Sequence, residues 1–265
     1  MLKSMTGFGR CENVTDEYKI SVEMKAVNHR YLDLSIKMPK KFNYFEASIR
    51  TLLKKYIQRG KVDLFINYED EFGIQNDVKV SALAKFPEVL TMEQVPDDEE
   101  HLWEILSEAL KEAAVRFVES REIEGEHLKK DLLGKLDYME TLVDFIEERS
   151  PQILTEYRNR LEDKVKELLN NTAMEESRIA AEVTIYADKI CVDEETVRLR
   201  SHIHNTRNGL LSGESVGRKL DFIAQEMNRE ANTILSKSTD LSISDKAIAL
   251  KTEIEKVREQ IQNIE

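Results

Sequence analysis

Residues 18–27 read Tyr-Lys-Ile-Ser-Val-Glu-Met-Lys-Ala-Val, with an apolar side chain at every second position. A period of two is typical of a strand with one buried face and one solvated face. The same alternation recurs at residues 32–38 and 62–68, and we expect residues 2–12 to form a first strand. The short connection at residues 28–30 joins two of these runs and predicts a hairpin.

A helix is predicted between the second and third alternating runs. Its apolar residues have helical spacing, and Gly60 lies just past its end, where a C-terminal cap is expected. These apolar residues are Phe45, Ile49, Leu52, Leu53 and Tyr56. The N-terminal part of the chain is therefore predicted to be a small sheet unit with the order β-β-β-α-β.

From about residue 98 the apolar pattern becomes helical and stays helical. Residues 100–172 predict two or three long amphipathic helices. Ser150 followed by Pro151 is typical of an N-cap and the first turn of a new helix. Residues 178–211 predict a further helical block, and residues 217–236 predict another helix.

The last segment has the most regular apolar seam. Its members step by three and four, which is typical of a helix that packs along a partner helix from its own chain or another. They are Ala247, Leu250, Ile254, Val257, Ile261 and Ile264. The predicted fold class is α+β, with an N-terminal β-rich domain (1–95), a long helical connecting region (96–176) and a helical C-terminal domain (177–265).

The net charge of −12 argues at first against a nucleic-acid partner, because phosphate repels an acidic surface. The charges are unevenly distributed, however. Residues 93–150 hold 18 acidic and 7 basic side chains, whereas residues 37–61 hold eight basic side chains and one acidic side chain. The second segment is able to face phosphate, although an ordinary amphipathic helix with lysines on its solvated side gives the same pattern.

Composition excludes several classes of protein. No apolar run reaches the length of a membrane span, and the first residues lack the apolar core of a secretory signal. Cys11 and Cys191 are the only cysteines, so there is no disulfide framework and no paired spacing for zinc. We expect a cytoplasmic protein without a membrane partner. Nucleotide hydrolysis and acyl transfer have no visible motif.

The predicted helix at 217–236 has an apolar face and a polar face. An apolar face gathers Leu220, Ile223, Met227, Ala231 and Ile234, and the opposite face gathers Arg218, Asp221, Gln225, Arg229 and Asn232. Guanidinium, amide and carboxylate groups in one stripe suit contacts to phosphate and ribose. Phe222 lies within the stripe, where a ring can stack on a base or fill a subunit contact. A solvated helix face with intrahelical pairs has the same spacing.

Acidic residues in the preceding block are candidates to hold a metal ion. Hydrolysis of a phosphodiester with metal assistance needs carboxylates that bind the cation. The carboxylates of this block converge only if the helix kinks near Val192, and Glu226 and Glu230 are rival ligands. Capping, ion-pair and solvated-face roles are equally compatible with all of them. The block contains Glu182, Asp188, Asp193, Glu194 and Glu195.

Histidines offer a metal-free alternative. His29, His202 and His204 are candidate general acids or bases. RNA carries its own nucleophile, the 2′-hydroxyl, so a cut by a histidine with a lysine or arginine is chemically feasible. A lone histidine on a helix is more often a surface or structural residue.

Several stretches of the sequence together carry a resemblance to a known family. In the first half they are Ser-Met-Thr-Gly-Phe-Gly (4–9), Val-Asn-His-Arg-Tyr-Leu (27–32), Arg-Gly-Lys-Val (59–62) and Arg-Glu-Ile-Glu-Gly-Glu (121–126). In the second half they are Gly-Arg-Lys-Leu-Asp-Phe (217–222), Gln-Glu-Met-Asn-Arg-Glu-Ala-Asn-Thr (225–233), Ser-Lys-Ser (236–238) and Arg-Glu-Gln-Ile-Gln-Asn-Ile-Glu (258–265). Together these stretches resemble the YicC (also YloC) family of bacterial proteins. The resemblance runs from end to end, and its last third is very specific. The segment 71–98 is shorter than expected for the family.

The resemblance implies an endoribonuclease that requires a divalent metal (Mn²⁺ or Mg²⁺). It also implies a homo-oligomer, expected to be a hexamer, that closes on structured or small RNA. Family members are also described as adaptors in small-RNA turnover, which makes other ribonucleases candidate partners.

The resemblance and the residue patterns together select the site residues. The predicted catalytic residues are Asp221, Glu226, Glu230 and His202, and the predicted metal ligands are Asp188, Asp193 and Glu194. The predicted RNA-binding residues are Arg218, Lys219, Gln225, Arg229, Asn232, Lys237, His29, Arg30, Lys54, Arg59 and Lys61.

Two other functions fit parts of the sequence. A non-catalytic adaptor would bind RNA and deliver it to another nuclease. A coiled-coil scaffold without an RNA role would fit the negative charge and the long helices. Salt-sensitive RNA binding separates the scaffold from the other two, and metal-dependent turnover separates the enzyme from the adaptor.

Overall fold

The computed structural model describes residues 2–15, 18–29, 31–70, 99–168, 176–212 and 217–265. Contacts within the chain divide it into two compact units, which we call the sheet unit (Ser4–Glu124) and the helical unit (Met1–Lys3 with Gly125–Glu265). This division differs from the predicted domain boundaries. The helix α3 (Glu99–Leu168) supplies its first part to the sheet unit and the remainder to the helical unit. The predicted boundary at residue 95 lies outside the described residues.

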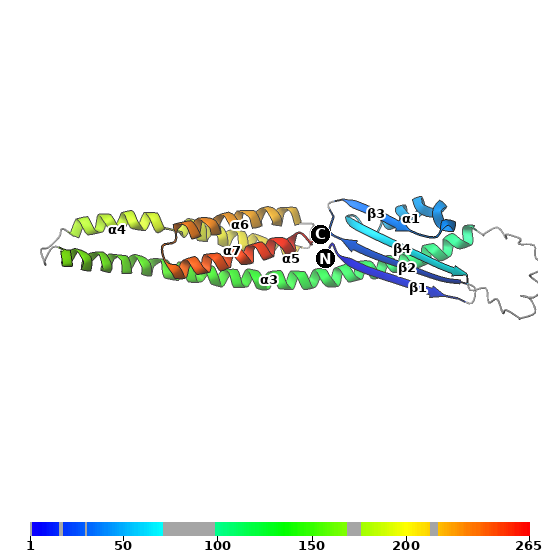
Figure 1. Cartoon of the computed structure of the whole chain (residues 1–265), viewed down its shortest axis with the longest axis horizontal. Helices are drawn as coiled ribbons and strands as arrows, with labels where there is room; N and C mark the ends of the chain where they lie inside the picture. The colour runs from blue at the N-terminus through cyan, green and yellow to red at the C-terminus, as the bar shows by residue number, and fades with distance from the viewer. Residues whose placement is uncertain (1, 16–17, 30, 71–98, 169–175, 213–216) are drawn as a thin grey trace, which may run out of the picture. The chain divides into compact units, whose positions relative to one another are not determined.

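The sheet unit contains one four-stranded sheet (Figure 1). Its strands are β1 (Gly7–Val14), β2 (Tyr18–Val27), β3 (Leu32–Lys37) and β4 (Gly60–Asp70), and their spatial order is β1-β2-β4-β3. β2 is antiparallel to both of its neighbours, whereas β3 is parallel to β4. The predicted order of strands and helix is confirmed, but the first strand covers residues 7–14 instead of 2–12.

The predicted hairpin at residues 28–30 is wrong, because β4 lies between β2 and β3. The chain between β3 and β4 contains the 3₁₀ helix η1 (Lys40–Phe45) and the helix α1 (Glu46–Leu53). A helical crossover of this kind is what allows two strands to pair in parallel. The crossover brings β4 back beside β2, where Val22 pairs with Ile66.

One face of the sheet is buried beneath helices. The buried side chains alternate along the strands, as the period of two predicted. α1 and the first part of α3 belong to the same apolar cluster, so both helices pack on this face. The cluster includes Ile20, Val22, Met24, Val62, Leu64, Ile66, Ile49, Leu53, Leu106 and Phe117.

The first strand lies very close to α3. A Cβ atom added to Gly9 would lie 2.3 Å from the carbonyl oxygen of Ala113 and 2.6 Å from Cβ of Phe117. Arg121 is only 2% exposed, and its Nε donates to the backbone carbonyl of Ser4 over 2.5 Å. The absence of a side chain at Gly9 therefore permits a close contact between strand and helix.

α3 is one helix of 70 residues, so the prediction of two or three helices with a new start at Pro151 is wrong. Proline removes one backbone hydrogen bond inside a helix and costs about 3 kcal/mol. The helix nevertheless continues, because Ile146 and Ile153, seven residues apart, are both buried in the core of the helical unit. Ser150 does not cap a new helix; its hydroxyl donates to the carbonyl of Ile146 over 2.7 Å.

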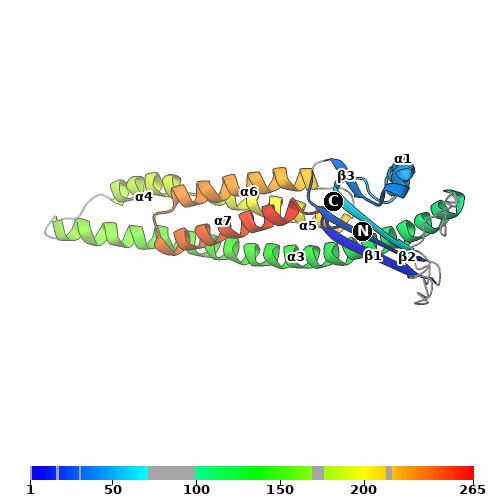
Figure 2. The same ribbon diagram turned by 45° about the vertical axis from the view of Figure 1, so that its right-hand side comes forward.

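The remaining helices of the helical unit are α4 (Glu176–Ile190), α5 (Asp193–Ser212), α6 (Gly217–Lys237) and α7 (Leu241–Ile261). α5, α6 and α7 lie beside α3 in both views (Figures 1 and 2). The predicted block 178–211 is therefore two helices, interrupted at Cys191 and Val192. Helix 217–236 is confirmed with nearly the predicted bounds.

The C-terminal seam is buried within its own chain. All six seam residues predicted from the sequence are 0–1% exposed and belong to the core of the helical unit, together with residues of α3, α5 and α6. The partner helices of this seam are therefore helices of the same molecule. The seam is not available as a surface for assembly with other copies.

Ion pairs join α3 to α5 at heptad spacing. Arg200 and Arg207, seven residues apart on α5, each bind two carboxylates of α3. The hydrogen bond from Arg200 lowers the pKa of Glu147. Much of the acidic charge on α3 is therefore paired inside the chain. The N···O distances are 2.5 Å to Asp144 and 2.7 Å to Glu147 for Arg200, and 2.7 Å to Asp137 and 2.9 Å to Glu140 for Arg207.

Among the described helices, none combines the length and the apolar character needed to cross a membrane.

Candidate functional site

α6 has the two faces that its sequence predicts. The apolar residues Leu220, Ile223, Met227, Ala231 and Ile234 are all buried. On the other face, Arg218, Lys219, Phe222, Gln225, Arg229 and Asn232 are exposed. The polar stripe is thus a real surface of the helical unit, and the apolar face fixes its orientation.

The exposed stripe contains groups suited to RNA. The side chain of Arg229 is 77% exposed, with Glu226 at the limit of ion-pair distance, 4.0 Å. Phe222 is 62% exposed, which is unusual for a phenylalanine beside charged residues. An exposed ring between cationic side chains is able to stack on a base while the cations bind phosphate.

Asp221 is engaged by neighbouring side chains. Its Oδ1 accepts a hydrogen bond from Nε of Arg258 on α7 over 3.2 Å, and its Oδ2 accepts one from Gln225 over 2.9 Å. Arg258 also lies 3.8 Å from Glu255. These contacts hold the carboxylate against α7, so the structure supports a role in packing α6 on α7 more directly than proton transfer.

A second group of charged residues lies where α5 packs against α6; we call it the α5–α6 seam (Glu194, Glu195 and Arg198 of α5; Glu230 and Lys237 of α6). Nζ of Lys237 lies 2.8 Å from Oε1 of Glu195 and donates to the carbonyl of Cys191 over 2.9 Å. Glu195 is only 6% exposed, and its Oε2 is buried without a hydrogen-bond partner among the described residues. A buried carboxylate oxygen without a hydrogen-bond partner is energetically costly, and it calls for a structural or functional explanation.

Arg198 connects the two helices within this seam. Its guanidinium bonds to Glu194 one turn earlier on α5 and lies 3.7 Å from Oε1 of Glu230 on α6. Glu230 is 5% exposed. The structure therefore brings Glu194, predicted as a metal ligand, close to Glu230, predicted as a catalytic residue, through one arginine.

The other predicted catalytic and metal-binding residues are less closely gathered. His202 is half-buried one turn after Arg198 on α5. Asp193 is exposed in the first turn of α5, and Asp188 is exposed near the end of α4. Within the described residues, no three His, Cys, Asp or Glu side chains converge in a geometry that holds a metal ion. The described part of one chain therefore does not fit a three-ligand metal site.

The predicted RNA-binding residues of the N-terminal part belong to the sheet unit. Lys54 at the end of α1 and Lys61 at the start of β4 are exposed. Nε of Arg59 donates to the backbone carbonyl of His29 over 3.3 Å, and the imidazole Nδ1 of His29 lies 2.9 Å from the carbonyl of Tyr31. These contacts order the turn around the histidine. Arg30 lies outside the described residues.

Glu195 belongs to the acidic block considered for metal binding, but neither Glu195 nor Arg198 is among the selected site residues, although the structure places both in the α5–α6 seam. A signal for Glu195 exists in the sequence. It precedes Leu199 and Ile203 by four and eight residues, so it shares the buried face of α5. A carboxylate in a core position of a helix indicates a partner on a neighbouring helix, here Lys237.

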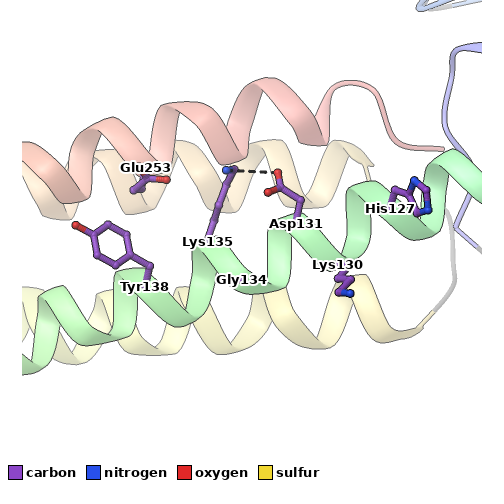
Figure 3. A pocket seen from close by; sticks show the side chains of 7 residues that line it. All are labelled: His127, Lys130, Asp131, Gly134, Lys135, Tyr138 and Glu253. Carbon is purple, nitrogen blue, oxygen red and sulfur yellow. Dashed lines mark ion pairs between the residues drawn. The ribbon is translucent and has the colours of Figure 1, made fainter.

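A groove of about 590 Å³ lies between α3 and α7 (Figure 3). None of the predicted site residues lines it. Lys135 lies 3.4 Å from Asp131, which also accepts a hydrogen bond from Gln260 over 2.6 Å; the bond from Gln260 lowers the pKa of Asp131. The lining residues are His127, Lys130, Asp131, Gly134, Lys135, Tyr138 and Glu253. Basic and acidic groups balance there, and the groove does not select one ligand.

Comparison with known proteins covers nearly all of the chain. Residues 146–265 match the model of the C-terminal region of YicC-like endoribonucleases. Residues 2–78 and 69–130 match the model of the N-terminal region of the same family.

Two curated relatives match over their full lengths and over the full length of this chain. A probable endoribonuclease YicC from Clostridioides difficile (strain 630) is 39% identical over 293 residues. A probable endoribonuclease YicC from Haemophilus influenzae is 30% identical over 291 residues. The matches include the helices that carry the exposed stripe and the seam, and the chain belongs to the YicC-like endoribonuclease family.

Proposed function

We propose that this chain is an endoribonuclease whose helical unit carries the reaction. Membership of the YicC-like family supports RNA cleavage. The observation that carries the assignment of the site is the α5–α6 seam, where the nearly buried Glu195 and Glu230 lie beside Lys237 and Arg198 next to an exposed cationic stripe.

The seam and the stripe have different tasks in this proposal. Arg218, Lys219 and Arg229 bind phosphates of the RNA, and Gln225 and Asn232 contact ribose or base edges. Arg198 and Lys237 stabilise the charge that develops on the phosphate in the transition state. Glu230, Glu226 and His202 are the candidates to move a proton from the attacking hydroxyl or to the leaving oxygen.

Metal dependence is a further part of the proposal. Mg²⁺ is commonly held by one or two carboxylates together with substrate phosphates. The exposed Asp193 and Glu194 are suited to such a shared site. A bound cation would supply additional positive charge beside the scissile phosphate. The proposed roles of Arg198, Lys237 and Glu230 do not depend on it.

Assembly as a homo-oligomer, expected to be a hexamer, is also proposed. The C-terminal seam is occupied inside the chain, so assembly requires another surface. Val197 and Leu211 are 66% and 56% exposed on α5 and lie two heptads apart, on one side of the helix. We expect light scattering to give a mass several times 30.8 kDa, and a monomer would contradict this part. A cytoplasmic location is likewise proposed.

The decisive experiment is cleavage of a labelled hairpin RNA by purified protein, with Mn²⁺ or with EDTA. Glu230→Gln is the test variant, and Glu162→Gln is the matched control, because Glu162 forms a helical-surface ion pair with Arg158 outside the seam. We expect cleavage to fall at least a hundredfold in Glu230→Gln and to stay unchanged in the control.

The outcomes separate the proposed enzyme from an adaptor. Equal cleavage by wild type and Glu230→Gln would point to a contaminating nuclease or a site elsewhere. Tight, salt-sensitive binding without cleavage by any preparation would favour an adaptor that presents RNA to another ribonuclease. Cleavage that persists in EDTA would remove the metal from the proposal and leave the residues of the seam in place.

A further inference from the structure

The sheet has a second face, which α1 and α3 do not cover. Side chains alternate along a strand, so the residues between the buried ones point to this open face. Most of them are charged or small and polar, as expected for a solvated surface. Two are phenylalanines: Phe8 on β1 and Phe65 on β4. Along β2, which lies between these strands, the open face carries Lys19, Ser21, Glu23, Lys25 and Val27.

Each phenylalanine ring has a lysine over it. Nζ of Lys25 lies 5.8 Å from the centre of the Phe8 ring, and Nζ of Lys37 lies 5.0 Å from the centre of the Phe65 ring. Phe8 is 46% exposed. The core is on the opposite side of the sheet, so neither ring is needed to fill it, and each costs solvation free energy where it stands.

Strand register fixes the separation of the two rings. Phe8 pairs with Lys25, and Phe65 pairs with Glu23 two residues away on the same strand, β2. With strands about 4.8 Å apart and a rise of about 3.4 Å per residue, the two ring positions are roughly 12 Å apart. Rings that stack on one another have centres within about 7 Å. The two phenylalanines are therefore separate platforms.

Basic and acidic side chains balance on the open face, so the lysines beside the rings, and not the overall charge, are what suits phosphate there. The acidic groups of this face on β1 and β2 are already paired: Glu12 lies 2.8 Å from Arg10 and 3.0 Å from Lys19, and Glu23 lies 2.5 Å from Lys25. The Lys19 ammonium and then Arg10 lower the pKa of Glu12. On the other side, β3 and β4 bring Lys37 and Lys61 to the same face, together with Asp33, Asp63 and Glu69.

We propose that the open face of the sheet binds single-stranded RNA, with one base stacked on Phe8 and another on Phe65. Lys25 and Lys37 then bind the phosphates beside these bases. Aromatic side chains on an open four-stranded sheet are an established way to hold unpaired bases, whereas a base within a duplex is not accessible to them. The inference deepens the proposed function and rests on it, because it names the unpaired part of the substrate.

Polar side chains beside Phe65 are able to contact the edges of a stacked base. Ser21 and Asn67 form a cross-strand pair next to Phe65 on this face. Hydroxyl and amide groups donate and accept hydrogen bonds, so they suit any of the four bases. The face is therefore expected to favour unpaired RNA with little dependence on base sequence, since stacking is available to every base.

The test compares Phe8→Leu, Phe65→Leu and the double variant with wild type, in the full chain. Leucine retains the apolar volume and removes the stacking surface. Phe145→Leu is the matched control, because Nζ of Lys246 lies 5.2 Å from the ring of Phe145 in the helical unit, the same arrangement away from the sheet. Affinity is measured by fluorescence anisotropy with a labelled oligouridylate and with a fully paired duplex.

We expect each phenylalanine variant to bind the single strand about tenfold more weakly, and the double variant to lose more. The duplex affinity and the Phe145→Leu variant should be unchanged. Wild-type affinity in both single variants would overturn the inference. A changed oligomeric mass with unchanged RNA affinity would also overturn it, because the face would then be an interface between copies of the chain.

A second measurement uses the wild-type protein, so it tests the inference even if the variants fail to fold. Wild-type protein is cross-linked to the oligouridylate with ultraviolet light, and the cross-linked peptides are identified by mass spectrometry. We expect peptides that contain residues 7–14 or 60–70. Cross-links confined to α6 would contradict the inference and leave the proposed function intact. Absence of any RNA binding or cleavage by the wild type would instead count against the proposed function itself.

Discussion

Removal of Lys237 tests whether the α5–α6 seam is both a structural and a functional feature. Lys237→Met leaves the carboxylate of Glu195 buried, with neither oxygen paired to a cation. Breaking a fully buried pair costs about 3–5 kcal/mol. The Lys237 side chain is 33% exposed, so water partly replaces it, and we expect a loss of about 2–3 kcal/mol. That corresponds to a fall in Tm of roughly 5–10 °C.

The compensating variant separates stability from function. Glu195→Leu combined with Lys237→Met replaces the pair by apolar groups and removes the unpaired oxygen. Such replacements are often neutral or stabilising, so the free energy of unfolding should return to within about 1 kcal/mol of wild type. RNA cleavage should stay lost, because the cation that stabilises the transition state is still absent.

The assay combines urea unfolding, followed by circular dichroism and by hydrogen exchange of the α5 and α6 amides, with cleavage of the hairpin RNA. Hydrogen exchange is needed because a chain with two units need not unfold in one step. Wild-type stability of Lys237→Met would refute the structural argument. Wild-type cleavage by the double variant would show that the seam lies outside the reaction site.

Three other changes have expected outcomes. The hydrogen bond from Ser242 and the guanidinium of Arg149 hold the pKa of Asp240 at about 2. The ionised Asp240 caps the N-terminus of α7, and the stability that this cap contributes is complete above the ordinary aspartate pKa and is lost as the pH falls toward 2. Asp240→Asn should therefore flatten the dependence of Tm on pH between about 4 and 2. Gly9→Ala should destabilise the sheet unit by roughly 2 kcal/mol or more and lower its Tm by more than about 5 °C, because the added Cβ would lie 2.3 Å from a backbone oxygen of α3. An unchanged Tm would mean that the strand and the helix can move apart at little energetic cost. Gly134→Ala should stabilise the helical unit by about 0.5–1 kcal/mol, since a Cβ there meets no atom within 4 Å. Urea unfolding with an equal or lower midpoint would contradict this expectation.

Local patterns accounted for most of the elements. The alternation from Tyr18 to Ala26 placed β2 and its buried face correctly, because burial on one side of a sheet has a strict period of two. The apolar residues of α6 and the C-terminal seam are buried as their spacing predicts. The polar stripe of α6 was also predicted, since it is the complement of that apolar face.

Strand pairing and helix ends depended on contacts far apart in the sequence. The alternation gives the faces of β2 and β3 but not their neighbours, and the short connection favoured a hairpin. The helix α1 between β3 and β4 is what places these two strands in parallel. At Pro151 the local signal for a new helix was overridden, because burial of Ile146 and Ile153 in one core outweighs the loss of a hydrogen bond.

By itself, the sequence determined most of the helices and strands, which side of them is buried, and the family to which the chain belongs. Only the tertiary structure decided that Glu195 meets Lys237, that Glu230 meets Arg198, and that Phe8 and Phe65 share the open face of one sheet. Periodicity depends on neighbours within one or two turns of the same element. Pairing between elements depends on register and packing among residues far apart in the chain, and no local pattern records it.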